Sequence, residues 1–254
     1  MHINEKEQEL IDLLMSANTV LTVKNIAKQL YISEPTARRY LTSLANKGYV
    51  VRTHGGAMIN YNMSLNKNVP LYLRISSLSE EKNKIAQSAA KLIRDGDVLF
   101  LDGSSSSFHL LPYLKNHHNL IVCTNSLKTA ITLAEMNIHT IALGGDVNLS
   151  NLACNSQETC DMIKNFNADI MFFSCDALSE TGELSDNNRE ASYLRKQFMH
   201  NSRVKVLLID NTKLNKQCWH SLCSLNDIDY CFCDVELPER LNSMVKSNKI
   251  INNR

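Results

Sequence analysis

The chain has 254 residues, and its 27 Lys or Arg and 26 Asp or Glu leave a formal net charge of +1. Hydrophobic residues make up 44% and charged residues 21%, as in ordinary globular proteins, which excludes a mostly disordered or collagen-like chain. No apolar run approaches the ~20 residues of a membrane span, and the acidic start MHINEKEQELIDLL lacks the basic-then-apolar order of a signal peptide. We therefore expect a soluble, cytoplasmic protein of two domains with no membrane partner.

Charge is distributed unevenly along the chain. Positions 18–56 hold six basic residues and one acidic residue, whereas residues 61–254 hold 20 basic and 21 acidic residues. A small basic unit joined to a near-neutral body is the charge distribution expected of a DNA-binding module attached to a domain with another role.

Three helices are expected in the basic unit. Residues 5–17 carry an apolar stripe at helical spacing. Thr22 is a good N-cap for a second helix and Ser33 for a third, and Pro35 lies in the first turn of the third helix, where a missing N–H costs nothing. A short helix, a turn and a third helix with a basic, hydroxyl-rich outer arc predict a helix-turn-helix.

A β-hairpin wing is expected directly after the third helix. Gly48 ends that helix, residues 49–52 form a strand, and Thr53-His54-Gly55-Gly56 forms a turn in which one glycine needs a positive φ. A basic helix alone is more often only a solvated face, but the order of cap, basic helix and wing favours DNA recognition. The residues expected to contact DNA are Thr36, Arg38, Arg39, Thr42, Ser43, Lys47, Arg52, His54, Gly55 and Gly56.

The stretch SEPTARRYLTSLANKGYVVRTHGGA resembles the N-terminal signature of DeoR-type regulators of sugar metabolism. That family has Ser-x-x-Thr-(Ile)-Arg-Arg-Asp-Leu, then a Gly, then Arg-x-His-Gly-Gly-Ala, and this chain departs from it with Tyr40 in place of the aspartate. The resemblance implies a winged helix-turn-helix that binds operator DNA, with Thr36 at the end of the helix that usually meets the bases.

Apolar strands alternate with amphipathic helices through the rest of the chain. Strands are expected at 98–101, 120–123, 140–143, 169–173, 205–209 and 229–233, and helices at 80–94, 127–135, 157–165 and 189–200. The repeated β-then-α order predicts a Rossmann-like, mainly parallel α/β fold with both sheet faces covered. We expect the winged helix-turn-helix at 1–59, a polar linker at 60–79 and the α/β sensor domain at 80–254.

Eight cysteines all follow residue 122 and include no CxxC pair, so we expect buried, reduced thiols. His117-His118 has no companions at metal-ligand spacing. We therefore expect neither a metal site nor a cofactor.

Polar residues follow five of the predicted strands, where ligands of parallel sheets bind. The first strand leads into four serines before a helix expected near Phe108, and hydroxyls at a helix N-terminus suit a phosphate, with Lys213 as a cation. Singly, such Ser and Asn residues cap helices, but together they favour a pocket for a phosphorylated sugar. The residues expected to bind this effector are Asp102, Gly103, Ser104, Ser105, Ser106, Ser107, Asn125, Ser126, Gly144, Gly145, Asp176, Glu190 and Lys213.

The family resemblance extends over about residues 5–241 and implies a sensor domain related in fold to ribose-5-phosphate isomerase. It is carried by Lys82-Asn83-Lys84-Ile85-Ala86, Thr124-Asn125-Ser126 and Glu190-Ala191, among other segments. Gly103 and Ser104 stand in exchanged order compared with the family's Asp-Ser-Gly-Thr-Thr loop, and Ser156, Ser174 and Ala177 replace family glycines. Loss of glycines restricts close ligand approach, so we expect a pocket of altered shape.

Three functions are compatible with these features. The first is a transcriptional repressor of a carbohydrate operon, a homodimer or homotetramer that releases operator DNA when it binds a phosphorylated sugar. The second is a sugar-phosphate isomerase with an attached DNA-binding domain, in which Asp176 or Glu190 would be the general base. The third is a scaffold whose N-terminal module contacts only proteins, which the basic stretch argues against. We favour the first.

Overall fold

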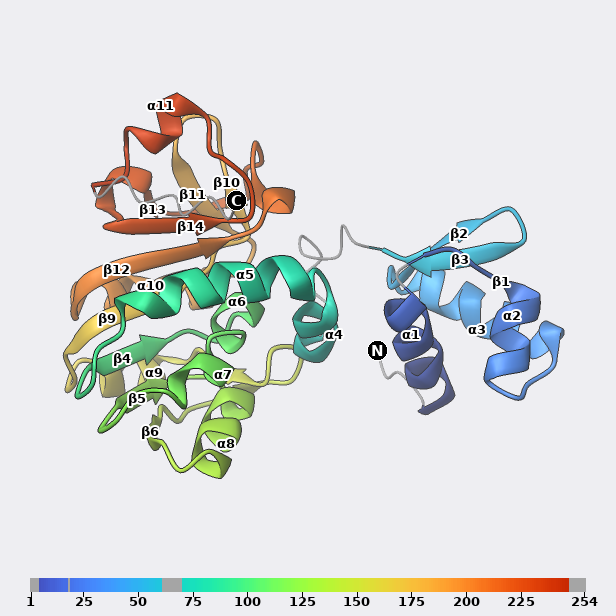
Figure 1. Ribbon diagram of the computed structural model, residues 1–254, viewed down its shortest axis with the longest axis horizontal. Coiled ribbons are helices and arrows are strands. Elements are labelled where there is room, and N and C mark those ends of the chain that lie inside the picture. Colours follow the sequence, from blue (N-terminus) through green and yellow to red (C-terminus); the bar gives the residue numbers. More distant parts are fainter. Residues whose placement is uncertain (1–4, 18, 61–69, 247–254) are drawn as a thin grey trace. The chain divides into compact units, whose positions relative to one another are not determined.

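The computed structural model describes residues 5–17, 19–60 and 70–246 of the chain (Figure 1). Contacts divide the chain into two compact units, Met1–Val69 and Pro70–Arg254. Residues 61–69, which form most of the first half of the predicted linker, lie outside the described ranges. No helix within those ranges combines the length and the apolar character needed to cross a bilayer.

The first unit contains three helices and a three-stranded antiparallel sheet. Its elements are α1 (Glu5–Ala17), β1 (Leu21–Thr22), α2 (Val23–Gln29), α3 (Glu34–Asn46), β2 (Val50–Thr53) and β3 (Gly56–Ile59). Thr22 and Ser33 are the predicted caps, since their side chains accept hydrogen bonds from the N–H groups of Asn25 (3.2 Å) and Thr36 (3.3 Å). Strand β1, which pairs with β3, was not predicted because two residues show no periodicity.

The helices of this unit bury the apolar faces that their spacing predicts. The fully buried side chains are Leu10, Ile11, Leu14, Ile26, Ala37, Leu41 and Leu44. Each buried Leu or Ile contributes about 1.5–3 kcal/mol relative to an exposed one, so this small core fixes the position of α3. The opposite arc of α3 remains available for other contacts.

The second unit begins earlier than the sequence predicted. Helix α4 (Leu71–Ser76) lies within the predicted linker 60–79, and α5 begins at Ser79. Leu71 and Leu73 are buried, which explains why this segment folds onto the body of the unit. With six residues, α4 is too short for its periodicity to be recognised in the sequence.

A six-stranded, fully parallel sheet forms the centre of the second unit (Figure 1). Its strands are β4 (Val98–Leu101), β5 (Ile121–Thr124), β6 (His139–Ala142), β9 (Ala168–Phe173), β12 (Ser202–Ile209) and β14 (Tyr230–Cys233), in the order β14-β12-β9-β4-β5-β6. All neighbouring pairs are parallel. The six predicted strands and the predicted Rossmann-like class are therefore confirmed, with strand bounds shifted by up to three residues.

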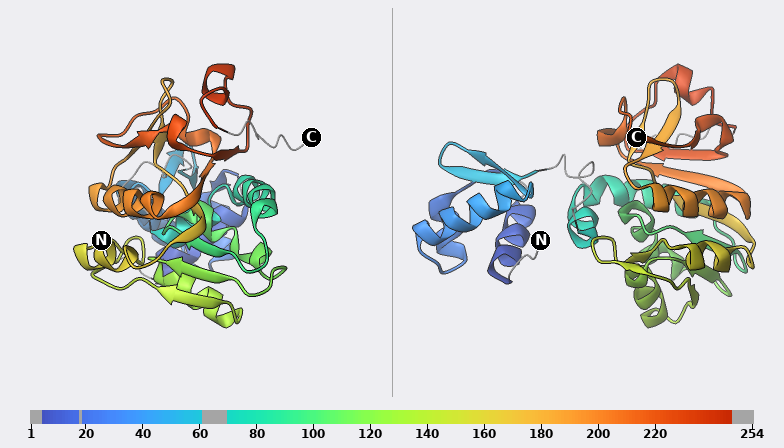
Figure 2. Two further views of the ribbon diagram at one scale, coloured as in Figure 1. Left: turned by 90° about the vertical axis from the view of Figure 1, so that its left-hand side faces the viewer. Right: turned by 180° about the vertical axis from the view of Figure 1, so that it is seen from behind.

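Helices cover both faces of this sheet, as the two views of Figure 2 show. One face packs against α5 (Ser79–Ala89), α7 (Leu111–Leu114) and α8 (Leu127–Glu135), and the other against α9 (Gln157–Ile163), α10 (Arg189–His200) and α11 (Glu239–Asn242). In β4, Leu99 and Leu101 belong to the first core and Phe100 to the second, where its ring meets Phe198 of α10 at 5.0 Å. Because both faces of its centre are buried, the central strand β4 is apolar along its length.

Short strands add two small antiparallel sheets beside the main one. They are β10 (Ala177–Leu178) with β11 (Glu183–Asp186) and β13 (His220–Ser224), and the hairpin of β7 (Val147–Asn148) and β8 (Ala153–Cys154). The sequence analysis missed them because segments of two to five residues carry little pattern. All eight cysteines are free thiols, of which Cys218 and Cys223 are only half-buried.

Candidate functional site

The outward arc of α3 presents part of the predicted DNA-contact set. Arg38 and Arg39 are exposed; Arg38 lies 3.7 Å from Glu34 in an exposed ion pair, and Arg39 lies over the ring of Tyr40 at 5.4 Å. Surface ion pairs of this kind are weak, so both guanidinium groups can turn toward a phosphate or a base at little cost. Thr36 lies at the N-terminal end of the helix, where its hydroxyl contacts that of Ser33 at 2.8 Å.

The wing is fixed to this helix by Arg52. Its Nη1 donates to the hydroxyl of Thr42 at 3.3 Å and to the carbonyl oxygen of Arg38 at 3.5 Å. Arg52 therefore holds the hairpin against α3 and brings its own charge beside the two arginines of the helix. Arg38, Arg39 and Arg52 are all exposed on this side of the unit.

Two predicted DNA contacts, Ser43 and Lys47, have another role. The Ser43 hydroxyl donates to Oε1 of Glu7 at 2.5 Å, and Lys47 Nζ lies 2.8 Å from Oε2 of the same carboxylate. Glu7 is 3% exposed, so this cluster joins α1 to α3 inside the unit. A helical wheel of α3 alone does not show where α1 packs, so these contacts with Glu7 were not foreseen, and DNA contact by Ser43 and Lys47 stays a prediction.

The two wing glycines differ in what they require. Gly55 is exposed and has φ = +83°, the positive φ predicted for the turn. Gly56 is buried, and a Cβ there would lie 2.2 Å from the carbonyl oxygen of Leu21 in the paired strand β1. Gly56 is thus required by strand pairing and is buried, whereas His54 and Gly55 remain exposed at the tip.

In the second unit, Asp102 joins the carboxyl ends of β4 and β9. Strand order reverses between these two strands, which is where ligands bind in open parallel sheets. One carboxylate oxygen of Asp102 accepts the Ser107 hydroxyl (2.6 Å) and the Ser104 N–H (3.2 Å), and the other accepts the Ser174 N–H (3.5 Å). The predicted effector residue Asp102 therefore lies buried at the reversal point.

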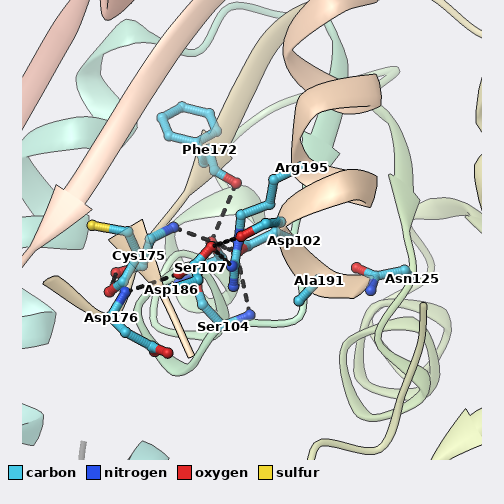
Figure 3. A network of polar contacts seen from close by, with 12 residues as sticks. Asp102, Ser104, Ser107, Asn125, Phe172, Cys175, Asp176, Asp186, Ala191 and Arg195 are labelled. Atoms are coloured by element: carbon cyan, nitrogen blue, oxygen red, sulfur yellow. Dashed lines mark hydrogen bonds and ion pairs between the residues drawn. The ribbon is translucent and has the colours of Figure 1, made fainter. Parts of the chain in front are cut away.

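Arg195 of α10 is the central cation of this network, and the sequence analysis did not select it. Figure 3 shows it reaching toward Asp102 and Asp186, with Nε 2.8 Å from Asp102 and Nη1 2.6 Å from Asp186. Burial lowers the pKa of Arg195, but the carboxylates of Asp186 and Asp102 outweigh burial and raise it. Burial raises the pKa of Asp186 in spite of Arg195. A charged residue on the same helix face as Leu194 and Phe198 was the signal that could have identified it.

A pocket of about 270 Å³, including the space at its open mouth, adjoins this network. It is lined by Asp102, Gly103, Asn125, Asn151, Ala153, Asn155, Ala191, Leu194, Arg195 and Phe198. Asn125 donates to the carbonyl of Cys154 (3.0 Å) and to Asn155 Oδ1 (2.9 Å), while its own buried Oδ1 has no hydrogen-bond partner among the described residues. Figure 3 shows Asn125 apart from the Arg195 network, across from Ala191. The pocket therefore offers carboxylate and amide oxygens to a donor such as a sugar hydroxyl.

The predicted serine loop is folded inward. Ser104 caps α6 (Ser105–Phe108), accepting from Ser107 N–H at 3.1 Å, and all four serines are buried. The helix begins at Ser105 and not near Phe108, and its single turn carries little dipole. Only Ser106 Oγ is a buried hydroxyl without a hydrogen-bond partner within this loop. Ser104 and Ser107 thus organise Asp102, and the predicted hydroxyl-rich loop lies at the N-terminus of α6 with its side chains buried.

Two lysines lie close to this loop. Lys213 Nζ donates to Ser174 Oγ at 2.8 Å and lies 3.6 Å from Asp210 Oδ2, an oxygen without a hydrogen-bond partner among the described residues. Lys82 is 4% exposed, and burial, together with the nearby charge of Lys213, lowers its pKa to about 7. The carboxyl end of the sheet thus holds two buried lysines, neither of which is among the residues that line the pocket.

The remaining predicted effector residues do not line the pocket. Ser126 caps α8, accepting from Thr129 N–H at 3.2 Å, and Asp176 Oδ2 accepts the Asn187 N–H at 2.8 Å. Glu190 is exposed on the first turn of α10. Gly144 and Gly145 are exposed beside the start of α9, where Thr159 donates to the Gly144 carbonyl. Within the described ranges, no cluster of three or more His, Cys, Asp or Glu side chains could hold a metal ion.

Comparison with known proteins extends these observations to both units. A family model of the DeoR-like helix-turn-helix domain matches residues 6–62, and one of the DeoR C-terminal sensor domain matches residues 77–235. The chain is 31% identical over 247 residues to the lactose phosphotransferase system repressor of Staphylococcus aureus strain N315, covering 96% of this chain and 97% of the relative.

Two further relatives match nearly the whole chain, and one solved structure matches about half of it. The L-fucose operon activator of Escherichia coli K12 is 27% identical, covering 90% of this chain and 94% of its own, and the glycerol-3-phosphate regulon repressor of the same strain is 26% identical over 98% of each chain. Ribose 5-phosphate isomerase A of Methanocaldococcus jannaschii overlaps 54% of each chain at 21% identity and a TM-score of 0.41. On these family matches, the chain belongs to the DeoR family of transcriptional regulators.

Proposed function

We propose that the chain represses a carbohydrate operon by binding operator DNA through α3 and the wing, and that a phosphorylated sugar in the sensor pocket relieves this repression. The observation that carries the proposal is the combination of an exposed basic face on α3 with a pocket at the strand-order reversal of the second unit. Relatives include both repressors and an activator, and the repressors include the one with 31% identity. Such a protein acts in the cytoplasm, where bacterial operators lie.

Arg39 is the proposed base-reading residue, with Arg38 and Arg52 on DNA phosphates. An arginine can donate two parallel hydrogen bonds to guanine, whereas phosphate contacts set register without sequence information. Thr36 at the helix end and His54 at the wing tip complete the proposed contact set. A single small module binds weakly, so we propose a homodimer or homotetramer on a repeated operator.

The proposed ligand combines hydroxyl groups with an anion. Asp102, Asn125 and Asn155 provide acceptors for hydroxyl groups, and Asn125 Oδ1 has no competing partner within the described ranges. The charge of Lys213 lowers the pKa of Lys82 further than burial alone does. A phosphate between the two lysines would relieve the repulsion between their ammonium groups.

Sugar-phosphate isomerase activity is the alternative that we do not favour. A general base must reach the proton beside the substrate carbonyl, and neither Asp176 nor Glu190 lines the pocket. Asp176 instead accepts a backbone N–H. Turnover of ribose 5-phosphate by the protein, abolished in Asp176→Asn, would overturn this preference.

A gel-shift assay on the DNA upstream of the protein's own gene tests the proposal. We expect binding by the parent and release by one of three probes, ribose 5-phosphate, fructose 6-phosphate or glycerol 3-phosphate, but not by ribose, fructose or glycerol. In thermal unfolding, a ligand at 100 times its dissociation constant adds about 2.7 kcal/mol to stability. Lys213→Ala should remove this shift and Lys164→Ala, an exposed control, should keep it. Equal effects of sugars and their phosphates would reject the phosphate site.

A further inference from the structure

Helix α4 is the first described element after residues 61–69, and the sensor unit holds it at several points. Leu71 N–H donates to the carbonyl of Ser150 at 2.9 Å, and Arg74 Nη2 donates to Asn151 Oδ1 at 3.1 Å. On its other side, Lys82 Nζ donates to the carbonyl oxygens of Arg74 (2.5 Å) and Ser77 (2.6 Å). Two of these contacts therefore come from the turn between β7 and β8.

That turn is also a wall of the pocket. Asn151 and Ala153 line the cavity beside Asp102 and Asn125. The turn is organised by Asn148, whose Oδ1 accepts from the N–H and hydroxyl of Ser150 (3.0 and 2.7 Å). The two strands that it joins have two residues each, so few backbone hydrogen bonds resist its movement. A ligand in the pocket meets a wall that also holds α4.

Arg74 connects helix α4 to the turn that lines the pocket. Its guanidinium is buried among the charges of Asp176, Asp102 and Arg195, and burial lowers its pKa, an effect that the carboxylates oppose. Of its five N–H donors, only the one on Asn151 has a hydrogen-bond acceptor assigned within the described residues. An amide oxygen is a weaker acceptor for arginine than a carboxylate or phosphate, so an anionic occupant competes with Asn151 on favourable terms.

We propose that the Arg74–Asn151 hydrogen bond is the connection through which the sensor pocket controls α4 and hence the segment leading to the DNA-binding unit. With the pocket empty, Asn151 holds Arg74 and α4 stays docked, which is the state competent for DNA. An occupant that engages Asn151 or Arg74 breaks the bond and loosens α4. This mechanism rests on the proposed function, because it supplies the step between ligand binding and DNA release.

The test uses the full chain with variants at Asn151, a half-exposed turn residue whose change leaves the core intact. Asn151→Ala removes the acceptor, whereas Asn151→Asp keeps the shape and strengthens the bond to Arg74. Leu149→Ala is the matched control, because Leu149 lies in the same turn, is 85% exposed and makes no contact that the argument uses. Amide hydrogen exchange of residues 71–77 and affinity for the upstream DNA are measured without ligand.

We expect faster exchange in α4 and an affinity for DNA lower by about tenfold to a hundredfold in Asn151→Ala, the effect of one hydrogen bond to a charged group. Asn151→Asp and Leu149→Ala should match the parent or exceed it. The proposal is overturned if Asn151→Ala keeps either the hydrogen exchange or the DNA affinity of the parent. It is also overturned if Asn151→Asp shows the same losses as Asn151→Ala. These measurements need no effector, so a parent that ignores all three sugar phosphates refutes the proposed ligand and not this connection. A probe that raises the melting temperature of the parent yet leaves α4 exchange unchanged also overturns it.

Discussion

Replacing Arg195 with leucine should destabilise the sensor unit more than any surface change. The guanidinium is the shared partner of two carboxylates whose side chains are 3% and 1% exposed, those of Asp102 and Asp186. Leucine matches much of the volume and suits the neighbouring Leu194 and Phe198, so the variant isolates the loss of charge. It leaves two buried carboxylates without their counter-charge.

The expected magnitude follows from that burial. Removing one partner of a buried ion pair costs about 3–5 kcal/mol, because the remaining charge stays desolvated. For a unit of this size, 1 kcal/mol shifts the melting temperature by about 2–4 °C, so a decrease of roughly 6–20 °C is expected. Arg203→Leu is the control: Arg203 pairs with Asp169 at 3.1 Å but is 72% exposed, and its loss should cost less than about 1 kcal/mol.

Fluorescence of Trp219 provides the assay, since the chain has one tryptophan and it lies in the sensor unit. Unfolding in urea is followed at pH 5 and pH 8. Because burial raises the pKa of Asp186 in the folded state, its unfavourable contribution is absent below the unfolded pKa and appears as pH rises through the folded pKa. The deficit of Arg195→Leu should therefore be larger at pH 8. A deficit below about 1 kcal/mol, or one that is equal at both pH values, would refute the assignment of Arg195 as the counter-charge.

Two predictions concern the winged unit. Arg39→Ala should weaken operator binding by about 1–3 kcal/mol without changing thermal stability. Lys47→Ala should lower the melting temperature, because it removes the cation that pairs with the buried carboxylate of Glu7. The reverse pattern in gel-shift and melting experiments would show that the roles of Arg39 and Lys47 are assigned wrongly. Gly56→Ala should disrupt the pairing of β1 with β3 and lower both stability and DNA affinity, because the alanine Cβ has no room beside Leu21. A variant with the circular dichroism, melting temperature and DNA affinity of the parent would show that β1 can move aside.

Local signals were sufficient for much of this fold. The caps Thr22 and Ser33 and the helices α8 and α10 lie where the sequence predicts, because a cap or an apolar stripe depends on residues within one or two turns. Helix α4 was missed because its stability comes from packing, which six residues do not reveal as a pattern.

The candidate site was harder to predict, because its partners are far apart in the chain. Asp102 was predicted from its place after a strand, but its partner Arg195 is 93 positions away on a helix. The serine loop illustrates the same difficulty: Ser107 donates to the Phe172 carbonyl as well as to Asp102, and nothing local shows that its side chain turns inward. Residue type and strand-end position identified the region, and only the tertiary contacts show which side chains are already occupied.

The charges at this end of the sheet lead to a last prediction about Lys82. Four buried or half-buried cations and four carboxylates meet there: Arg74, Lys82, Lys213 and Arg195 with Asp102, Asp176, Asp186 and Asp210. Burial and Lys213 lower the pKa of Lys82 to about 7, so above that pH the cluster lacks one positive charge.

A phosphate bound beside Lys82 would favour its ammonium form, so binding above pH 7 should take up a proton. Affinity for a sugar phosphate should then fall by up to about tenfold per pH unit between pH 7.5 and 9, where the phosphate itself is already a dianion. Calorimetry in buffers of different ionisation enthalpy measures the proton uptake directly. Lys82→Met should abolish the uptake and flatten the profile, while Lys164→Ala, whose ammonium is exposed, should keep both. Binding without proton uptake in the parent would mean that Lys82 is not beside the bound anion, and the phosphate would then have to be neutralised by Lys213 and Arg74 alone.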